Sequence, residues 1–117
     1  MGDASDVALW DRSLTGDSAA FGALFDRHRD RVYRHARRLV QQASDAEDLT
    51  AIAFLELWRR RESVRIVDNS VLPWLLVTTG NAARNASRAR RRHARFLATL
   101  PAPEQVPDFG DDLAERL

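Results

Sequence analysis

The sequence predicts an all-α protein, a compact bundle of three longer helices preceded by a short N-terminal helix. Apolar residues recur at spacings of three and four through most of the chain, and no stretch alternates apolar and polar residues as a strand would. The 117 residues suffice for one domain with its own core. Because the chain has no cysteine, disulfides and thiolate metal sites are excluded.

Cap residues and an apolar stripe predict the first two helices. Ser5 or Asp6 suits the cap of a short first helix, and Gly16 suits its left-handed end. Asp17 then caps a second helix. The stripe residues of this second helix, expected to face the core, are Phe21, Leu24, Phe25, His28, Val32, Ala36 and Leu39.

The third predicted helix is apolar almost all round. Ser44 and Glu47 have the spacing of a capping box at its start. At about 100° per residue, one side carries Leu49, Ile52, Ala53 and Leu57, and the other carries Ala51, Phe54, Leu55 and Trp58. A domain of this size rarely surrounds a helix completely, so the second side indicates a protein partner. The alternative is that Phe54 and Trp58 contact the preceding helices instead.

A polar turn over residues 67–70 leads to a fourth helix, whose first turn accommodates Pro73 and which ends near Leu100. Its arginines at spacings of four, three and four form one basic ridge, made of Arg84, Arg88, Arg91 and Arg95. Trp74, Val77 and Asn81 extend this ridge toward the helix start, whereas Leu75, Ala82, Ala86 and Ala89 fall on the opposite, core-facing side.

Charge is unevenly distributed along the chain. The net charge is only +1, but no acidic residue occurs between Asn69 and Pro103. Arginines contact phosphates, an amide reads a base edge and an indole stacks on an exposed base, so the ridge suits unstacked DNA. The alternative is a solvated arginine face with Trp74 in the core.

The residues predict no catalytic, metal or cofactor site. His28, His35 and His93 have neither the neighbours nor the spacing of a nucleophile or metal motif, and no glycine-rich phosphate loop occurs. His28 lies on the apolar stripe, as a structural histidine would. Apolar runs are too short to cross a bilayer and the N-terminus lacks a leader, so we expect a cytoplasmic protein with no membrane partner and no enzymatic activity.

Three runs of sequence together resemble a known family. GDSAAFGALFDRHRDRVYRHARRLV, SDAEDLTAIAFLELWRRR and LPWLLVTTGNAARNASRARRR are similar, in order and separation, to regions two-one to two-four of extracytoplasmic-function (ECF) sigma factors of the sigma-70 superfamily. The match covers residues 6–100. It implies that residues 1–100 form sigma region 2 and that 101–117 begin an interdomain linker, the second, region 4 domain being absent from this chain.

The resemblance implies two binding sites in a transcription initiation factor. The first docks on the clamp helices of the largest subunit of RNA polymerase core through Asp48, Leu49, Phe54, Leu55 and Trp58, although Ala51 and Ile52 depart from the family pattern. The second recognises and melts the promoter minus-ten element on the non-template strand, through Asp68, Asn69, Ser70, Trp74, Asn81, Arg84, Asn85, Arg88 and Arg91. An anti-sigma factor is a further partner that the family implies.

Two other functions fit parts of the pattern. A duplex-binding repressor would have a compact helix-turn-helix and a dimer interface, which the long fourth helix does not resemble. A helical protein-interaction module would leave the arginines solvated, and it would bind its partner without binding nucleic acid.

Overall fold

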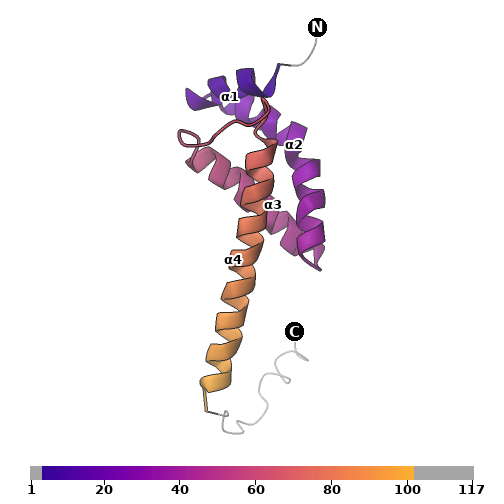
Figure 1. The fold of residues 1–117 in the computed structure, drawn as a ribbon, viewed down its shortest axis with the longest axis vertical. Coiled ribbons are helices and arrows are strands. Elements are labelled where there is room, and N and C mark those ends of the chain that lie inside the picture. Colours follow the sequence, from indigo (N-terminus) through magenta and orange to yellow (C-terminus); the bar gives the residue numbers. More distant parts are fainter. Residues whose placement is uncertain (1–3, 102–117) are drawn as a thin grey trace, which may run out of the picture.

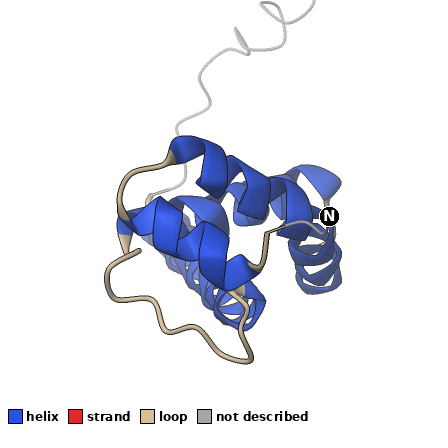
Figure 2. Ribbon diagram, turned by 90° about the horizontal axis from the view of Figure 1, so that it is seen from above, coloured by secondary structure: helices blue, strands red, loops and turns tan. Residues whose placement is uncertain are grey.

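The computed structural model describes residues 4–101, which form four helices. They are α1 (Asp6–Leu14), α2 (Ser18–Leu39), α3 (Ala43–Arg59) and α4 (Leu72–Thr99). Within these residues no strand is present, so the predicted all-α class is confirmed. Helices α2, α3 and the first half of α4 pack against one another, and α1 lies across the end of the bundle where α4 begins (Figures 1 and 2).

The starts of α1 and α2 follow the predicted caps. The Ser5 hydroxyl accepts the Ala8 amide at 3.1 Å, and the Asp17 carboxylate accepts the Ala20 amide at 3.1 Å. Gly16 has a φ of +93° between the two helices, as predicted.

The predicted capping box of α3 is wrong. The helix begins at Ala43, and its N-cap residue Gln42 makes no side-chain cap hydrogen bond. Ser44 therefore already lies inside the first helical turn, where it cannot occupy the N-cap position.

The core lies where the four helices meet. The predicted α2 stripe is confirmed over most of its length, because Leu24, His28, Val32 and Ala36 are buried. Leu39, the last residue of α2, is 43% exposed. The largest fully buried side chains from the other helices include Leu57 and Leu75.

The predicted orientation of α3 is rotated relative to the structure. Phe54, expected on the partner side, is 4% exposed, and Ile52, expected in the core, is 43% exposed. The buried arc instead runs through Leu49, Thr50, Ala53, Phe54 and Leu57. Helix α3 packs against both α2 and α4, and the ring of Phe54 meets that of Phe25 edge-on at 4.8 Å between centroids. The open alternative for Phe54, a contact with α2, is therefore the correct one.

Helix α4 is long enough, about 42 Å at 1.5 Å per residue, to run past its neighbours. Every residue from 87 to 100 is exposed, and Figure 1 shows this half standing clear of the other helices. Ala89, predicted to face the core, is exposed for this reason. The helix ends at Thr99, close to the predicted Leu100.

None of the four described helices is long and apolar enough to span a membrane. The predicted linker over 101–117 lies, apart from Pro101, outside the described residues.

Candidate functional site

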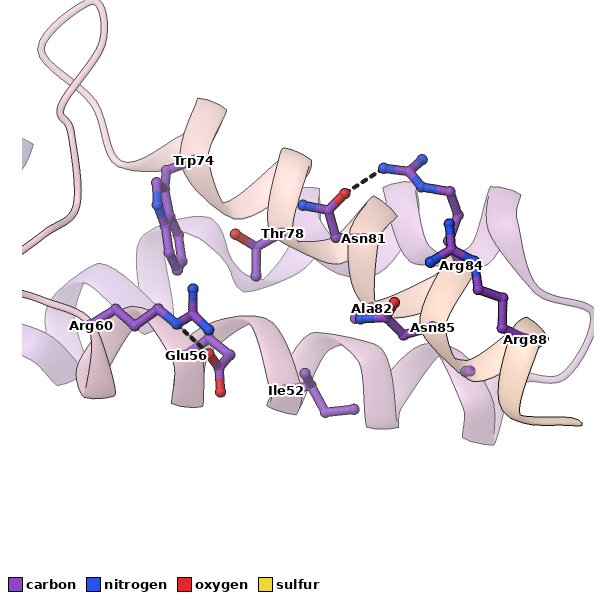
Figure 3. Close-up of a pocket in the computed structure, with 11 residues that line it drawn as sticks. Ile52, Glu56, Arg60, Trp74, Thr78, Asn81, Ala82, Arg84, Asn85 and Arg88 are labelled. Atoms are coloured by element: carbon purple, nitrogen blue, oxygen red, sulfur yellow. Dashed lines mark hydrogen bonds and ion pairs between the residues drawn. The ribbon is translucent and has the colours of Figure 1, made fainter. Parts of the chain in front are cut away.

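A groove runs between α3 and the first half of α4. Trp74 and Thr78 project from α4 toward Ile52 and Glu56 of α3 and toward Arg60, which directly follows α3 (Figure 3). Asn81 lies further along α4, with its amide turned toward Arg84. The groove continues along α4 past Asn85 to Arg88. It brings together five predicted DNA-binding residues, which are Trp74, Asn81, Arg84, Asn85 and Arg88.

The groove carries an excess of positive charge. Its acidic residue, Glu56, is already paired with Arg60 at 2.9 Å and with Arg59 at 3.1 Å. Arg84, Arg88 and Arg91 are exposed, and no acidic residue in the described part of the chain forms an ion pair with them. These guanidinium groups are therefore free to contact an anionic backbone.

Two polar side chains along α4 are held in place. Arg84 donates a hydrogen bond to the side-chain carbonyl of Asn81, which leaves the Asn81 NH2 group free to donate.

Trp74 is half-buried, because one part of its indole packs against the core cluster while another part lines the groove. Trp74 thus contributes to both the core and the groove, and its role in binding DNA stays a prediction.

The loop before α4 closes in a tight turn. The Ser70 amide donates to the Val67 carbonyl at 3.1 Å, and the Val67 amide donates back to Ser70 at 3.4 Å. The two central residues, Asp68 and Asn69, have φ values of +54° and +57° and are exposed. Left-handed backbone is uncommon outside glycine, and Asp and Asn tolerate it best. The turn over residues 67–70 therefore presents two short polar side chains to solvent.

Ser70 does not lie with these two side chains. Its hydroxyl donates to the Asp6 carboxylate at 3.0 Å and accepts the Leu72 amide at 3.0 Å. The hydroxyl thus points inward and accepts the first amide of α4, so its position suits holding the turn.

Asp6 is the buried partner at this point. Its carboxylate also accepts from Arg27 at 2.7 Å, from Nε2 of His28 at 2.6 Å and from the Val71 amide at 3.1 Å. Burial raises the pKa of Asp6, but the hydrogen bonds from Arg27, Val71 and His28 outweigh it and hold that pKa below its ordinary value. His28 is accordingly the structural histidine that its position on the stripe indicates.

The sequence does not reveal this role of Asp6, which reads there only as an alternative cap. One signal was present. Once Ser5 supplies the cap, Asp6 falls one residue inside the helix, next to buried Leu9 and Trp10, where a carboxylate needs donors.

A second, apolar surface lies on the other flank of α3, facing α2. It is a shallow depression lined by Ser18, Phe21, Phe25, Ala51, Phe54, Leu55 and Trp58. Leu55 is 55% exposed in it. The ring of Trp58 is held between Phe21, edge-on at 5.0 Å, and the Arg61 guanidinium, 4.3 Å from the ring centroid.

Of the five residues predicted to bind polymerase, two are exposed, Asp48 and Leu55, and Trp58 is half-buried. Leu55 and Trp58 belong to the apolar surface, and Asp48 is exposed two turns before Leu55 on the same side of α3. Leu49 and Phe54 are 3% and 4% exposed. Both side chains support α3 from within the core, and Phe54 also lines the apolar surface, so their role as contact residues stays a prediction.

The described residues contain no group of three or more His, Asp or Glu side chains placed to hold a metal ion.

Comparison with known proteins identifies the fold. The family model for Sigma-70 region 2 matches residues 24–93, more than half of the chain. The chain belongs to this family. The prediction drawn from the three sequence runs is therefore confirmed, and the family match spans α3, the loop and most of α4.

Individual relatives agree with the family. The chain is 37% identical over 109 residues to RNA polymerase sigma factor CarQ of Myxococcus xanthus, covering 91% of this chain and 62% of that protein. It is 32% identical over 106 residues to the ECF RNA polymerase sigma factor SigK of Mycobacterium sp. (strain KMS), covering 86% of this chain and 55% of that protein. The chain thus spans less than two thirds of these curated relatives.

A solved structure shares the fold. One chain of the RsbN–BldN complex superimposes with a TM-score of 0.61 at 31% identity, covering 80% of this chain and 66% of that one.

Proposed function

We propose that this chain is a transcription initiation factor domain that binds RNA polymerase core through the apolar surface and recognises and melts the promoter minus-ten element through the groove and the turn. One observation carries the proposal. Helix α3 gives one flank to each surface, and the two surfaces share no lining residue. One domain therefore has room for polymerase and DNA together. The chain would act in the cytoplasm, and the catalysis of RNA synthesis would be that of the polymerase.

The apolar surface suits a helical partner. Clamp helices form a coiled coil, and a helix binds a shallow apolar depression by inserting a few anchor side chains or receiving them. Exposed Leu55 and half-buried Trp58 are the anchors here, with Asp48 as a polar contact on the same side. Burying a fully exposed leucine side chain contributes about 1.5–3 kcal/mol to the free energy of binding. Leu55 is 55% exposed, so its burial against a partner should contribute about half of that.

The groove and the turn suit a single strand of DNA. Extruding a base costs a few kcal/mol of stacking and pairing. Stacking on an aromatic ring such as Trp74 returns about 1–3 kcal/mol per base, and arginines along α4 add phosphate contacts. Asp68 and Asn69, at the exposed tip of the turn, are the side chains proposed to read the extruded base.

An anti-sigma factor is proposed as a further partner. The apolar surface is exposed in the isolated chain, and a regulator that covered it would prevent polymerase docking. The structural relative was itself solved as a complex of two proteins.

Calorimetry with a clamp-helix fragment of the polymerase largest subunit tests the proposal. Leu55→Asp should weaken binding at least tenfold, because it puts a charge into the apolar contact. Leu39→Asp is the matched control, since Leu39 is similarly exposed at the far end of α2. Phe54 is unsuitable for this test because its truncation would damage the core.

Equal affinities of the two variants, or no binding by the folded wild-type chain, would contradict polymerase docking at this surface. Binding to the clamp helices without any binding to single-stranded DNA would favour the protein-interaction module instead.

A further inference from the structure

We infer that Asp6 is a positioning residue for DNA recognition, whose carboxylate holds the turn over residues 67–70 so that Asp68 and Asn69 face the extruded base. The inference rests on the proposed function, because the turn reads DNA only if this chain binds the minus-ten strand. Asp6 lies outside residues 24–93, the part of the chain that the family match covers.

The Asp6 carboxylate joins two helices and a loop at one point. One oxygen accepts Arg27, and the other accepts His28, the Ser70 hydroxyl and the Val71 amide. Arg27, Ser70 and the Val71 amide donate, which matches an ionised carboxylate because it only accepts. Since the lowered pKa keeps Asp6 ionised, Nε2 of His28 is the donor in the fourth contact. The last two donors are 64 and 65 residues away in sequence.

The turn needs to be held at both ends. At its start, Val64 and Ile66 pack against the core cluster. At its end, Ser70 directly follows Asn69 and is fixed by Asp6, and the same hydroxyl accepts the Leu72 amide. Apolar packing thus holds one side of the turn and the Asp6 carboxylate holds the other. Without the carboxylate, the end of the turn would lose its tie to α1, and the Val67–Ser70 backbone bonds would carry more of the load on the left-handed pair.

Substitutions separate this role from general stability. Asp6→Asn keeps the size of the side chain but turns an amide donor toward groups that are all donors. Ser70→Ala removes the hydroxyl link from the loop side and leaves Arg27, His28 and the Val71 amide paired with Asp6. Asp17→Asn is the matched control. Asp17 also lies at the start of a helix and pairs with an arginine, Arg12 at 3.0 Å, but it makes no hydrogen bond to the loop before α4.

The test uses single-stranded DNA with a randomised six-base centre, from which the wild-type chain selects its preferred sequence. Fluorescence anisotropy then gives the ratio of affinities for the selected strand and its scrambled version. We expect Asp6→Asn and Ser70→Ala each to lower this ratio at least fivefold. The affinity for the scrambled strand and for the clamp helices should stay within twofold, a split that a merely unfolding variant would not show.

The double variant and the control complete the design. Both substitutions break the hydrogen bond between the Ser70 hydroxyl and Asp6. The double variant should therefore reduce the affinity ratio no further than the larger of the two single effects, and Asp17→Asn should leave the ratio unchanged. If Asp6→Asn does not fold, Ser70→Ala decides alone. If the wild-type chain selects a sequence but the folded variants keep the same affinity ratio, the inference about Asp6 is overturned and the proposed function stands. If the wild-type chain selects no sequence, the proposed function is overturned as well.

Discussion

Phe54 and Leu55 are adjacent in sequence but belong to different parts of the molecule. Phe54 is 4% exposed against Phe25, and Leu55 is 55% exposed. We predict that Phe54→Ala lowers the free energy of unfolding by about 3–5 kcal/mol, because it leaves a cavity in the core. Leu55→Ala should change it by less than about 0.5 kcal/mol. Urea denaturation measures both, and similar losses from the two variants would contradict the orientation of α3.

Asp6 makes the stability of the protein depend on acid pH. Its pKa is lowered in the folded state, since the hydrogen bonds from Arg27, Val71 and His28 outweigh the effect of burial. The carboxylate therefore stabilises the fold above its ordinary pKa of about 3.9, and this stabilisation is lost as the pH falls through the lower folded value. We predict that Asp6→Asn lowers the melting temperature at pH 7 and that its difference from wild type narrows below about pH 4. A constant difference across this range would contradict an ionised Asp6.

At the scale of the element, α4 contains a glycine that its backbone does not require. Gly80 lies within the helix, and a methyl group added there would meet only the end of the Arg84 side chain, at 3.7 Å. We predict that Gly80→Ala raises the free energy of unfolding by about 0.5–1 kcal/mol, because alanine restricts the unfolded chain and favours helix. Thermal unfolding measures this change. A loss of stability would mean that α4 requires the conformational freedom of glycine at position 80.

The two faces of α4 should differ in their contact with DNA. Arg88 lines the groove, whereas Arg90 lies on the other side of the same helix and is equally exposed. We predict that Arg88→Ala weakens single-strand binding and reduces the slope of log affinity against log salt by about 0.7, the value for one lost phosphate contact. Arg90→Ala should leave the slope nearly unchanged. Equal slopes for both variants would indicate a diffuse charge effect rather than a groove.

Local chemistry accounts for what the sequence could predict about these elements. The caps at Ser5 and Asp17, the left-handed Gly16 and the α2 stripe depend on residues within one or two turns. The orientation of α3 does not. Because the helix is apolar almost all round, its neighbours α2 and α4 decide which arc is buried, and that choice exchanges the expected positions of Ile52 and Phe54.

At the scale of the whole molecule, the candidate site was predictable where one helix carries it. Five of the predicted DNA-binding residues line one groove because they share a face of α4. The inward position of Ser70 and the role of Asp6 depend instead on a contact across 64 residues, which no local pattern encodes. The sigma resemblance correctly identifies the family, but two of its expected contact residues, Leu49 and Phe54, are buried in this chain.

The arrangement of the molecule is compatible with the proposed binding of polymerase and DNA at the same time. The apolar surface and the groove lie on different flanks of α3, so occupation of one does not block the other. We predict a complex that contains the chain, polymerase core and the selected single strand together.

The most direct measurement is therefore analytical ultracentrifugation of polymerase core with a fluorescent selected strand, with and without this chain. We predict that the strand sediments with the core only when the chain is present, and that Leu55→Asp abolishes this co-sedimentation while leaving strand binding to the chain intact. A strand that displaces the chain from the core, or a folded chain that joins neither ligand, would contradict the account.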